Sequence, residues 1–298
     1  MSLAKCIQNQ KPAAIILFVN PRNRYLFPLI AYIKIAKIKL IYWGHGIDLQ
    51  NKKSFIKNIL NRIQQRLSDA LILYAEHLKK YINPSRHAKC FIANNTLNLA
   101  GIEIPQFAKE QLLLSFGIAT SRNIIFTGRV QKRKRIQDLL DAFELLDRED
   151  TGLIIVGPID KDMNSIVSKT RKNVYFIGPC YGIKVLQLLQ SSDVYCMPGA
   201  IGLSIVDAQF CGLPVVTEAV EHGPEIMYLI NGVNGYIVER DNPAALAEYV
   251  SRLLTNEELR SRFSAAARNE IATNGHIDTM CEGFVQCLDF ITKRRAVE

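Results

Sequence analysis

Five lysines and arginines cluster within seven residues, from Arg129 to Arg135, directly after the apolar run IIFTG. Gly128 lets the chain turn at the end of that run, so that Arg129 and Lys134 can face the same anion. The planar fork of an arginine and the point charge of a lysine together suit a diphosphate. A solvated basic turn would have the same composition. Charge alone does not choose among nucleic acid, anionic lipid and a phosphorylated small molecule.

A second candidate site lies in the segment from Asp193 to Val216, where Pro198 and Gly199 end an apolar run. Gly202 then opens a predicted helix that carries Asp207. Small residues at the start of a helix let a phosphate or sugar approach bare backbone amides. A carboxylate further along the helix can accept hydrogen bonds from ribose hydroxyls. An ordinary strand–turn–helix explains the segment equally well. The amides concerned are those of Ile201, Gly202 and Leu203.

Both candidates follow short apolar runs, and such runs alternate with helix-period segments along the whole chain. This alternation is typical of βα units around parallel sheets buried on both faces, and it predicts an α/β fold. In open sheets of this kind, ligands bind beyond the carboxyl ends of the strands. The strand-like runs are AAIILFV, KLIYW, ALILYA, KCFIAN, NIIFTG, GLIIVG, VYFIG, DVYCMPG and PVVTE.

Helical periodicity is clearest over residues 136–146 and after Asn242-Pro243, where apolar side chains recur every three or four positions. The apolar stretch from Leu26 to Trp43 is interrupted by three lysines, so it indicates a helix followed by a buried strand rather than a membrane span. A domain boundary is expected near residues 101–120, where the alternation breaks.

The composition is that of a globular protein, with 48% hydrophobic and 22% charged residues in a chain of 298. That length allows two α/β domains. Seven cysteines without CxxC spacing indicate reduced core residues and a cytoplasmic protein. His77, His87 and His276 have no His, Cys or Asp partner at metal-ligand spacing. The sequence predicts neither a metal nor a cofactor.

The order of the motifs FTGR-x4-K, GLIIVG, VYFIG, MPG-x2-GL-x3-DA-x3-GLPVV and HGPE-x6-G-x2-G resembles the C-terminal domain of family 4 glycosyltransferases, over residues 123–255. The resemblance implies the GT-B fold, in which two Rossmann-like domains face a cleft. It also implies transfer of a sugar, with retention of anomeric configuration, from a UDP- or GDP-linked donor.

Carried over by position, the resemblance makes Arg129 and Lys134 the diphosphate clamp, which stabilises the leaving group. The family has two glutamates eight residues apart, and Gly199 and Asp207 occupy those positions here. Asp207 keeps the acidic ribose contact, whereas Gly199 loses the side chain that contacts the donor sugar. A similar PG-x2-GL version occurs in bacterial surface-polysaccharide transferases. The expected donor-binding set is Gly128, Arg129, Lys134, Gly199, Ile201, Gly202, Leu203 and Asp207.

The first third of the chain resembles the later half of a family 4 acceptor domain, in which Trp43-Gly44-His45-Gly46 ends a strand. By that resemblance His45 joins Arg129 and Lys134 as a catalytic residue. The opening strand and its glycine-rich loop have no counterpart, which implies a shortened domain. The expected domains are 1–118, an incomplete acceptor-side domain, 119–275, the donor domain, and 276–298, a helix returning to the first.

The expected enzyme transfers sugar to a lipid-linked or polysaccharide acceptor at the inner face of the cell membrane. The net charge of +9 and the lysine-studded N-terminal segment favour an anionic membrane as partner. No RNA- or DNA-binding motif accompanies the basic cluster, so no nucleic acid partner is expected. The alternative is a non-catalytic descendant that binds a nucleotide or a protein partner.

Overall fold

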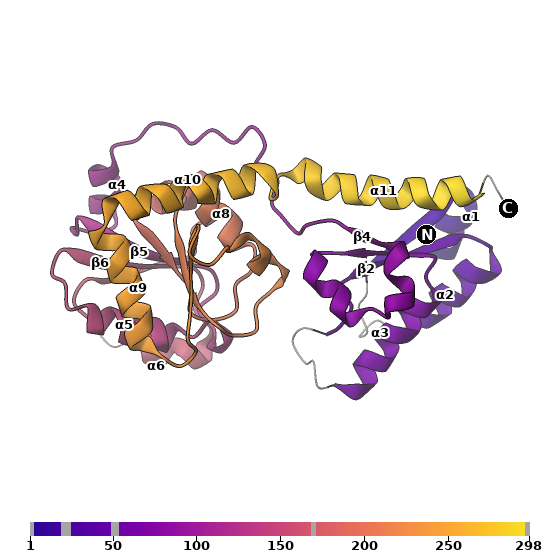
Figure 1. The fold of residues 1–298 in the computed structure, drawn as a ribbon, viewed down its shortest axis with the longest axis horizontal. Coiled ribbons are helices and arrows are strands. Elements are labelled where there is room, and N and C mark those ends of the chain that lie inside the picture. Colours follow the sequence, from indigo (N-terminus) through magenta and orange to yellow (C-terminus); the bar gives the residue numbers. More distant parts are fainter. Residues whose placement is uncertain (1–2, 19–24, 49–53, 168–170, 296–298) are drawn as a thin grey trace. The chain divides into compact units, whose positions relative to one another are not determined.

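The computed structural model describes residues 3–18, 25–48, 54–167 and 171–295. The chain forms two compact units, one of Met1–Asn95 with Ile277–Glu298 and one of Thr96–His276. Every strand pair described in either unit is parallel, which confirms the predicted α/β class. Figure 1 shows the elements of each unit.

The first unit contains a four-stranded sheet in the order β1-β2-β3-β4. Consecutive strands are neighbours, so each connection crosses in the same direction along the sheet. The strands are β1 (Ala14–Phe18), β2 (Lys39–Gly44), β3 (Ala70–Leu73) and β4 (Cys90–Ile92). The other elements are α1 (Leu3–Gln10), α2 (Leu26–Ile35), α3 (Phe55–Leu67), the 3-10 helices η1 (Glu76–Tyr81) and η2 (Pro84–Lys89), and α11 (Ile277–Arg295).

Alternate residues of these strands face opposite sides of the sheet, as the period of two requires. Ile41 and Ile72 form a core with Cys287 and Ile291 of α11 on one side. Leu40 packs on α2 on the other side, where α3 also lies (Figure 1). The stretch from Leu26 to Trp43 is therefore a helix and a buried strand, as predicted.

The second unit contains a six-stranded sheet in the order β10-β9-β8-β5-β6-β7. Read from the first strand of the unit, this is the doubly wound order 3-2-1-4-5-6 of dinucleotide-binding folds. The strands are β5 (Arg122–Thr127), β6 (Thr151–Val156), β7 (Val174–Gly178), β8 (Val194–Cys196), β9 (Val215–Glu218) and β10 (Gly235–Val238).

Helices cover both faces of this sheet and close one large core, in which residues of β5, β6 and β8 are almost wholly buried (Figure 1). Asn242 caps α9 by accepting the Ala245 N–H, as its place before a proline suggested. The elements are α4 (Lys109–Ser115), η3 (Lys132–Lys134), α5 (Ile136–Leu146), η4 (Lys161–Met163), α6 (Asn164–Val167), α7 (Ile183–Gln190), α8 (Ser204–Phe210), η5 (Pro224–Tyr228), α9 (Pro243–Thr255) and α10 (Glu257–Thr273).

The boundary between the units differs from the one expected near residue 118. Residues 96–118 belong to the second unit, because Leu113 and Ile118 are buried in its core and Leu97 and Ile104 pack against it. The break in the strand–helix alternation suggested a linker over these residues, but their apolar side chains pack against the core of the second unit. The C-terminal helix α11 groups with the first unit, where Gly283 allows it to approach the Ile92 carbonyl closely.

No helix among the described residues is both long enough and apolar enough to cross a lipid bilayer.

Candidate functional site

The strand order of the second unit marks one place for a ligand. The chain winds away from β5 in one direction through β6 and β7, and in the other through β8, β9 and β10. Loops that follow β5 and β8 therefore diverge at their carboxyl ends and leave a crevice there, where the helix N-termini also lie. Gly128, Arg129 and Lys134 follow β5, and residues 199–203 follow β8, so the predicted site residues of this unit meet at one edge.

Backbone contacts join these two loops directly. The Gly199 N–H donates to the Lys134 carbonyl at 3.2 Å, and the Ala200 N–H donates to the Arg133 carbonyl at 3.0 Å. The turn that carries the cations is therefore fixed to the loop after β8 by its main chain.

Gly199 has a steric reason to be glycine. A Cβ atom built there would lie 2.2 Å from the Arg133 carbonyl oxygen and 2.5 Å from the Lys134 carbonyl carbon. Both are backbone atoms, so neither can move aside as a side chain does. The carboxylate that the family pattern has at this position is replaced here by close contact between two loops. At Gly202, by contrast, an added Cβ meets nothing within 4 Å.

Lys134 is a buried cation with only neutral hydrogen-bond partners. Its side chain is 5% exposed, and its Nζ donates to the Ala200 carbonyl and to Met197 Sδ. Burial and, to a smaller extent, the charge of the neighbouring Arg133 lower the pKa of Lys134 to about 8, against the opposing charge of Glu225. It forms no ion pair with any residue in the described ranges. An anion in the crevice would stabilise its charge.

Arg129 lies in a different environment. Its guanidinium is 58% exposed and pairs with Asp160, which follows β6, at 3.0 Å. The structure therefore places the two predicted clamp residues on one edge of the sheet but engages their side chains with different loops. A shared contact with a diphosphate remains a prediction for both.

Arg135 anchors the basic turn, a role that sequence reasoning did not assign. It adopts the left-handed conformation, at a φ of 54°, directly before α5. Its Nε lies 2.9 Å from both Asp138 and the fully buried Glu218, and its guanidinium also pairs with Asp241. A non-glycine residue holds this conformation only where its surroundings compensate the strain. The ion pairs provide that compensation and fix the residue next to Lys134.

His222 joins the loops after β8 and β9. Its Nδ1 accepts the Ile201 N–H at 3.2 Å, so the neutral ring carries its proton on Nε2, which donates to the Glu218 carbonyl at 2.8 Å. Burial lowers the pKa of His222, and the nearby charge of Lys134 lowers it too. The Ile201 amide is therefore already bonded, which corrects the expectation that it is bare. The sequence signal was the motif EHGPE, which by itself indicates only a turn.

Asp207 carries a carboxylate that bonds to no residue in the described part of the chain. Burial raises the pKa of Asp207 to about 6, and no described cation or hydrogen-bond donor counters it. It lies near Tyr195, whose hydroxyl donates to Ser204 at 2.8 Å, at the start of the same helix. Hydroxyl donors from a ligand would satisfy this carboxylate and favour its charged form. The ribose contact of Asp207 stays a prediction.

Two further features of the backbone lie beyond the carboxyl ends of β5 and β8. Gly128 has a φ of +135°, a conformation that favours glycine, and it lets the chain leave β5 sharply. The amides of Gly202 and Leu203 make no hydrogen bond to any residue that the structure describes. They remain available to a ligand, as predicted for two of the three amides named.

His45 belongs to the first unit, where it directly follows β2. Its ring stacks on Tyr74 with the centroids 4.6 Å apart, and burial lowers its pKa while Asp48 opposes the shift. Neither ring nitrogen bonds to a described residue. Gly46 beside it has a φ of +79° and is held by hydrogen bonds to Tyr42 and Gln65. A neutral imidazole is thus presented from a firmly fixed strand end.

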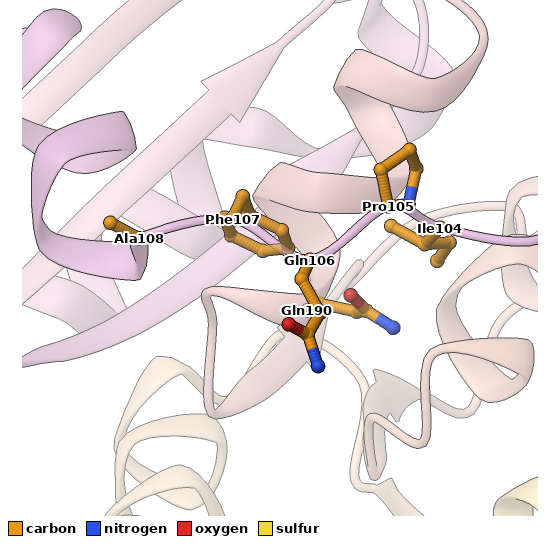
Figure 2. A pocket seen from close by; sticks show the side chains of 6 residues that line it. All are labelled: Ile104, Pro105, Gln106, Phe107, Ala108 and Gln190. Carbon is orange, nitrogen blue, oxygen red and sulfur yellow. The ribbon is translucent and has the colours of Figure 1, made fainter.

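A hollow of about 550 Å³ lies elsewhere in the second unit, between residues 104–108 and Gln190 at the end of α7 (Figure 2). Its lining contains no charged side chain, so it lacks the groups that would bind a phosphate. Within the described ranges, no cluster of three or more His, Cys, Asp or Glu residues is placed to hold a metal ion.

The fold and the site together define an α/β protein whose second unit is doubly wound. At its switch point this unit gathers a buried lysine with an aspartate and two backbone amides that bond to no described residue. Residues 115–270 match the family model of glycosyl transferases group 1. That match covers more than half of the chain, and the protein belongs to this glycosyltransferase family.

Known proteins extend the similarity beyond that segment. An uncharacterized glycosyltransferase of Methanocaldococcus jannaschii is 24% identical over 271 residues, which cover 85% of this chain and 68% of that protein. A phosphatidyl-myo-inositol mannosyltransferase of Mycobacterium leprae is 31% identical over 160 residues, half of this chain and 42% of that one. The chain thus spans less than half the length of the mycobacterial relative.

The fold is shared with Anabaena HepE, whose crystal structure was determined in complex with UDP. The TM-score is 0.80 at 18% sequence identity, over 96% of this chain and 81% of that one. Similarity at this level establishes the GT-B type of fold.

Proposed function

We propose that the protein transfers a sugar from a nucleoside-diphosphate donor, UDP- or GDP-linked, and that the edge formed by β5 and β8 binds the donor. The observation that carries the proposal is Lys134, a cation that is 5% exposed, has a depressed pKa and forms no ion pair within the described chain. Burying such a charge is costly unless a ligand compensates it. A diphosphate beside Nζ would supply that compensation and would become a better leaving group.

Asp207 supports a nucleoside rather than a bare phosphate. Its carboxylate has no bonding partner in the described ranges, and a pKa of about 6 leaves it mostly ionised near neutral pH. Two ribose hydroxyls are donors that suit one carboxylate. In the proposed arrangement Lys134 and Arg129 hold the diphosphate, Asp207 holds the ribose, and the amides of Gly202 and Leu203 contact the phosphate or the sugar.

Retention of anomeric configuration is the proposed stereochemical outcome. Gly199 carries no carboxylate, and the Arg133 and Lys134 backbones leave no room for a side chain there. A nucleophilic carboxylate at that position is therefore not part of the scheme. The acceptor hydroxyl would attack from the face of the leaving phosphate, which takes its proton.

The proposed acceptor is lipid-linked or a growing polysaccharide, met at the cytoplasmic face of a membrane. The mycobacterial relative is named as a transferase to a phosphatidyl-inositol, which supports a lipid acceptor. Surface-polysaccharide synthesis is the pathway class that we propose on the PG-x2-GL motif.

A transfer assay tests the proposal. The full chain would be incubated with a membrane extract and a panel of radiolabelled UDP and GDP sugars. We expect label in a lipid-extractable or polymeric product from one donor, and loss of that transfer in Lys134→Met. Tight nucleotide binding without transfer from any donor would favour the non-catalytic alternative. Absence of nucleotide binding altogether would contradict the donor site itself.

A further inference from the structure

Helix α3 of the first unit is amphipathic in the opposite sense to the usual one. Its buried side is polar, because Asn61, Gln64 and Gln65 are each no more than 4% exposed. Gln65 donates to the Gly46 carbonyl at 2.7 Å and contacts Tyr42, so this polar side faces the sheet. Gln65 thus ties this side of the helix to the end of β2, whereas the amide of Gln64 is buried without a hydrogen-bond partner among the described residues.

The apolar side of α3 faces outward. Phe55 and Ile56 are 76% and 71% exposed, and three further apolar residues at four-residue spacing follow along the same face. Residues three and four apart share one side of a helix, so these side chains form one continuous stripe. A helix in a globular protein normally turns such a stripe to the core. The three further residues are Ile59, Ile63 and Leu67.

The charges of α3 all have one sign. Arg62 and Arg66 are exposed and border the stripe, and neither guanidinium forms an ion pair with a described residue. Lys57 is the other charged residue of the helix, and it pairs with Asp48 at 2.6 Å. At the end of the helix Arg86 donates to the Arg66 and Ser68 carbonyls, which adds a further cation.

The part of the chain around α3 also has a positive net charge. Residues 1–95 contain 16 lysines and arginines against three aspartates and glutamates, a net charge of +13. Residues 96–298 contain 21 against 25, a net charge of −4. The overall excess of +9 therefore comes from the region that carries α3, although the densest cationic cluster lies in the second unit.

We infer that the apolar stripe of α3, with Arg62 and Arg66 beside it, is a docking surface for an anionic lipid bilayer. An apolar face bordered by arginines lies in the interface of a bilayer, with the side chains among the acyl chains and the guanidinium groups at the headgroups. The +13 charge of residues 1–95 would attract the same surface over a longer range. This inference deepens the proposed membrane partner, but it involves neither Lys134 nor Asp207.

A second copy of the chain fits this surface poorly. An isologous contact through α3 would place the same patch of two copies together, Arg62 and Arg66 included. Each copy would also bring the +13 charge of residues 1–95 to the contact. A phospholipid headgroup instead supplies one negative charge for each cation, so charge complementarity favours the bilayer.

Co-sedimentation with vesicles tests the surface. The full chain would be mixed with vesicles of phosphatidylglycerol and phosphatidylcholine, and with vesicles of phosphatidylcholine alone. We expect binding to the anionic vesicles that weakens with added salt. Ile56→Gln with Ile63→Gln should reduce it about tenfold or more, since two apolar side chains no longer enter the interface. Leu114→Gln with Leu145→Gln removes two exposed leucines of the second unit and should leave it unchanged.

Charge reversal separates the arginines from general attraction. Arg62→Glu with Arg66→Glu should reduce binding to anionic vesicles about tenfold or more. Lys109→Glu with Lys184→Glu changes the net charge equally on the second unit and should have a much smaller effect. UDP affinity, measured on the same variants, should stay at the wild-type value. If neither the wild-type chain nor any variant binds UDP, that result counts against the proposed donor site and not against the docking surface.

Three results would overturn the docking surface. The first is no binding of the wild-type chain to anionic vesicles at low salt. The second is equal binding by the α3 variants and their matched controls. The third is a dimer without lipid that Ile56→Gln with Ile63→Gln converts to a monomer, because the stripe would then be a contact between copies.

Discussion

The two units use the same architecture, a parallel sheet between helices, but they distribute charge in different ways. Near the switch point of the second unit, Arg135 pairs with Glu218 and Asp138, whereas Lys134 and Asp207 form no ion pair within the described residues. In residues 1–95 of the first unit cations outnumber acidic residues by 13, and an apolar helix face lies open. This difference fits the two proposals, in which the second unit binds a nucleoside diphosphate and the first unit binds an anionic bilayer.

The largest effect is expected at Gly199, where the loops after β5 and β8 of the second unit are in contact. Gly199→Ala places a Cβ against the Arg133 carbonyl, so the basic turn must shift. We expect a loss of about 2–4 kcal/mol in stability, the upper range for overpacking, with nucleoside diphosphate affinity reduced at least tenfold. Urea unfolding and titration calorimetry measure the two effects.

Gly202→Ala is the matched control for Gly199→Ala. Its Cβ meets nothing within 4 Å, and its φ lies outside the left-handed region, so stability should change by less than about 1 kcal/mol. Equal effects of the two substitutions would show that the contact between the loops does not hold the turn.

Lys134→Met should separate binding from stability. A charged hydrogen bond to the diphosphate is worth about 1.5–3 kcal/mol, so affinity for UDP or GDP should fall by that amount. Removal of an unpaired buried charge should at the same time raise the free energy of unfolding without ligand by about 1–2 kcal/mol. Calorimetry and urea unfolding of the same preparation give both values. A variant that loses stability along with affinity would mean that Lys134 supports the fold.

Asp207→Ala should have a smaller, ligand-dependent effect. If the carboxylate holds the ribose, the substitution should cost about 1 kcal/mol more for a ribonucleotide than for its 2′-deoxy analogue. Titration of both ligands against wild type and variant supplies the comparison. Equal losses of affinity for the two ligands would show that Asp207 does not bind the 2′-hydroxyl. A contact with the 3′-hydroxyl would still agree with that result.

The smallest effect on donor affinity is expected in the other unit. His45→Ala should change nucleoside diphosphate affinity by less than about 0.5 kcal/mol, because the residues proposed to hold the diphosphate all belong to the second unit. Sugar transfer should nevertheless fall, measured with the same donor at saturation. Loss of affinity together with transfer would mean that His45 supports the fold and not the chemistry.

Much of the fold followed from sequence pattern, for a simple reason. Buried parallel strands have to be apolar on both faces, so runs such as GLIIVG are visible without any knowledge of their neighbours. The boundary at residue 118 was wrong because Leu97, Leu113 and Ile118 are buried in a core that pattern alone does not reveal.

The candidate site was predictable in its positions but not in its contacts. The place of Lys134 after a strand end follows from spacing, whereas its depressed pKa depends on burial by neighbours distant in the sequence. The ion pair of Arg135 with Glu218 joins residues 83 positions apart, and the Ile201 bond to His222 joins two loops. The orientation of α3 was equally hidden, because an amphipathic pattern defines two faces without saying which one is buried.

Proton uptake on ligand binding tests the central claim most directly, namely that a buried, partly deprotonated lysine receives the diphosphate. The pKa of Lys134 is lowered to about 8, so at pH 8.5 this side chain is neutral in most molecules. An anion beside Nζ favours the charged form and raises that pKa. Binding should therefore take up protons at pH 8.5 and little at pH 6.5, and affinity should fall as pH rises through 8. Calorimetry with UDP in two buffers of different ionisation enthalpy measures the uptake, which should vanish in Lys134→Met and persist in Arg129→Met. Binding of UDP without proton uptake at pH 8.5, or the same uptake in Lys134→Met, would contradict the account.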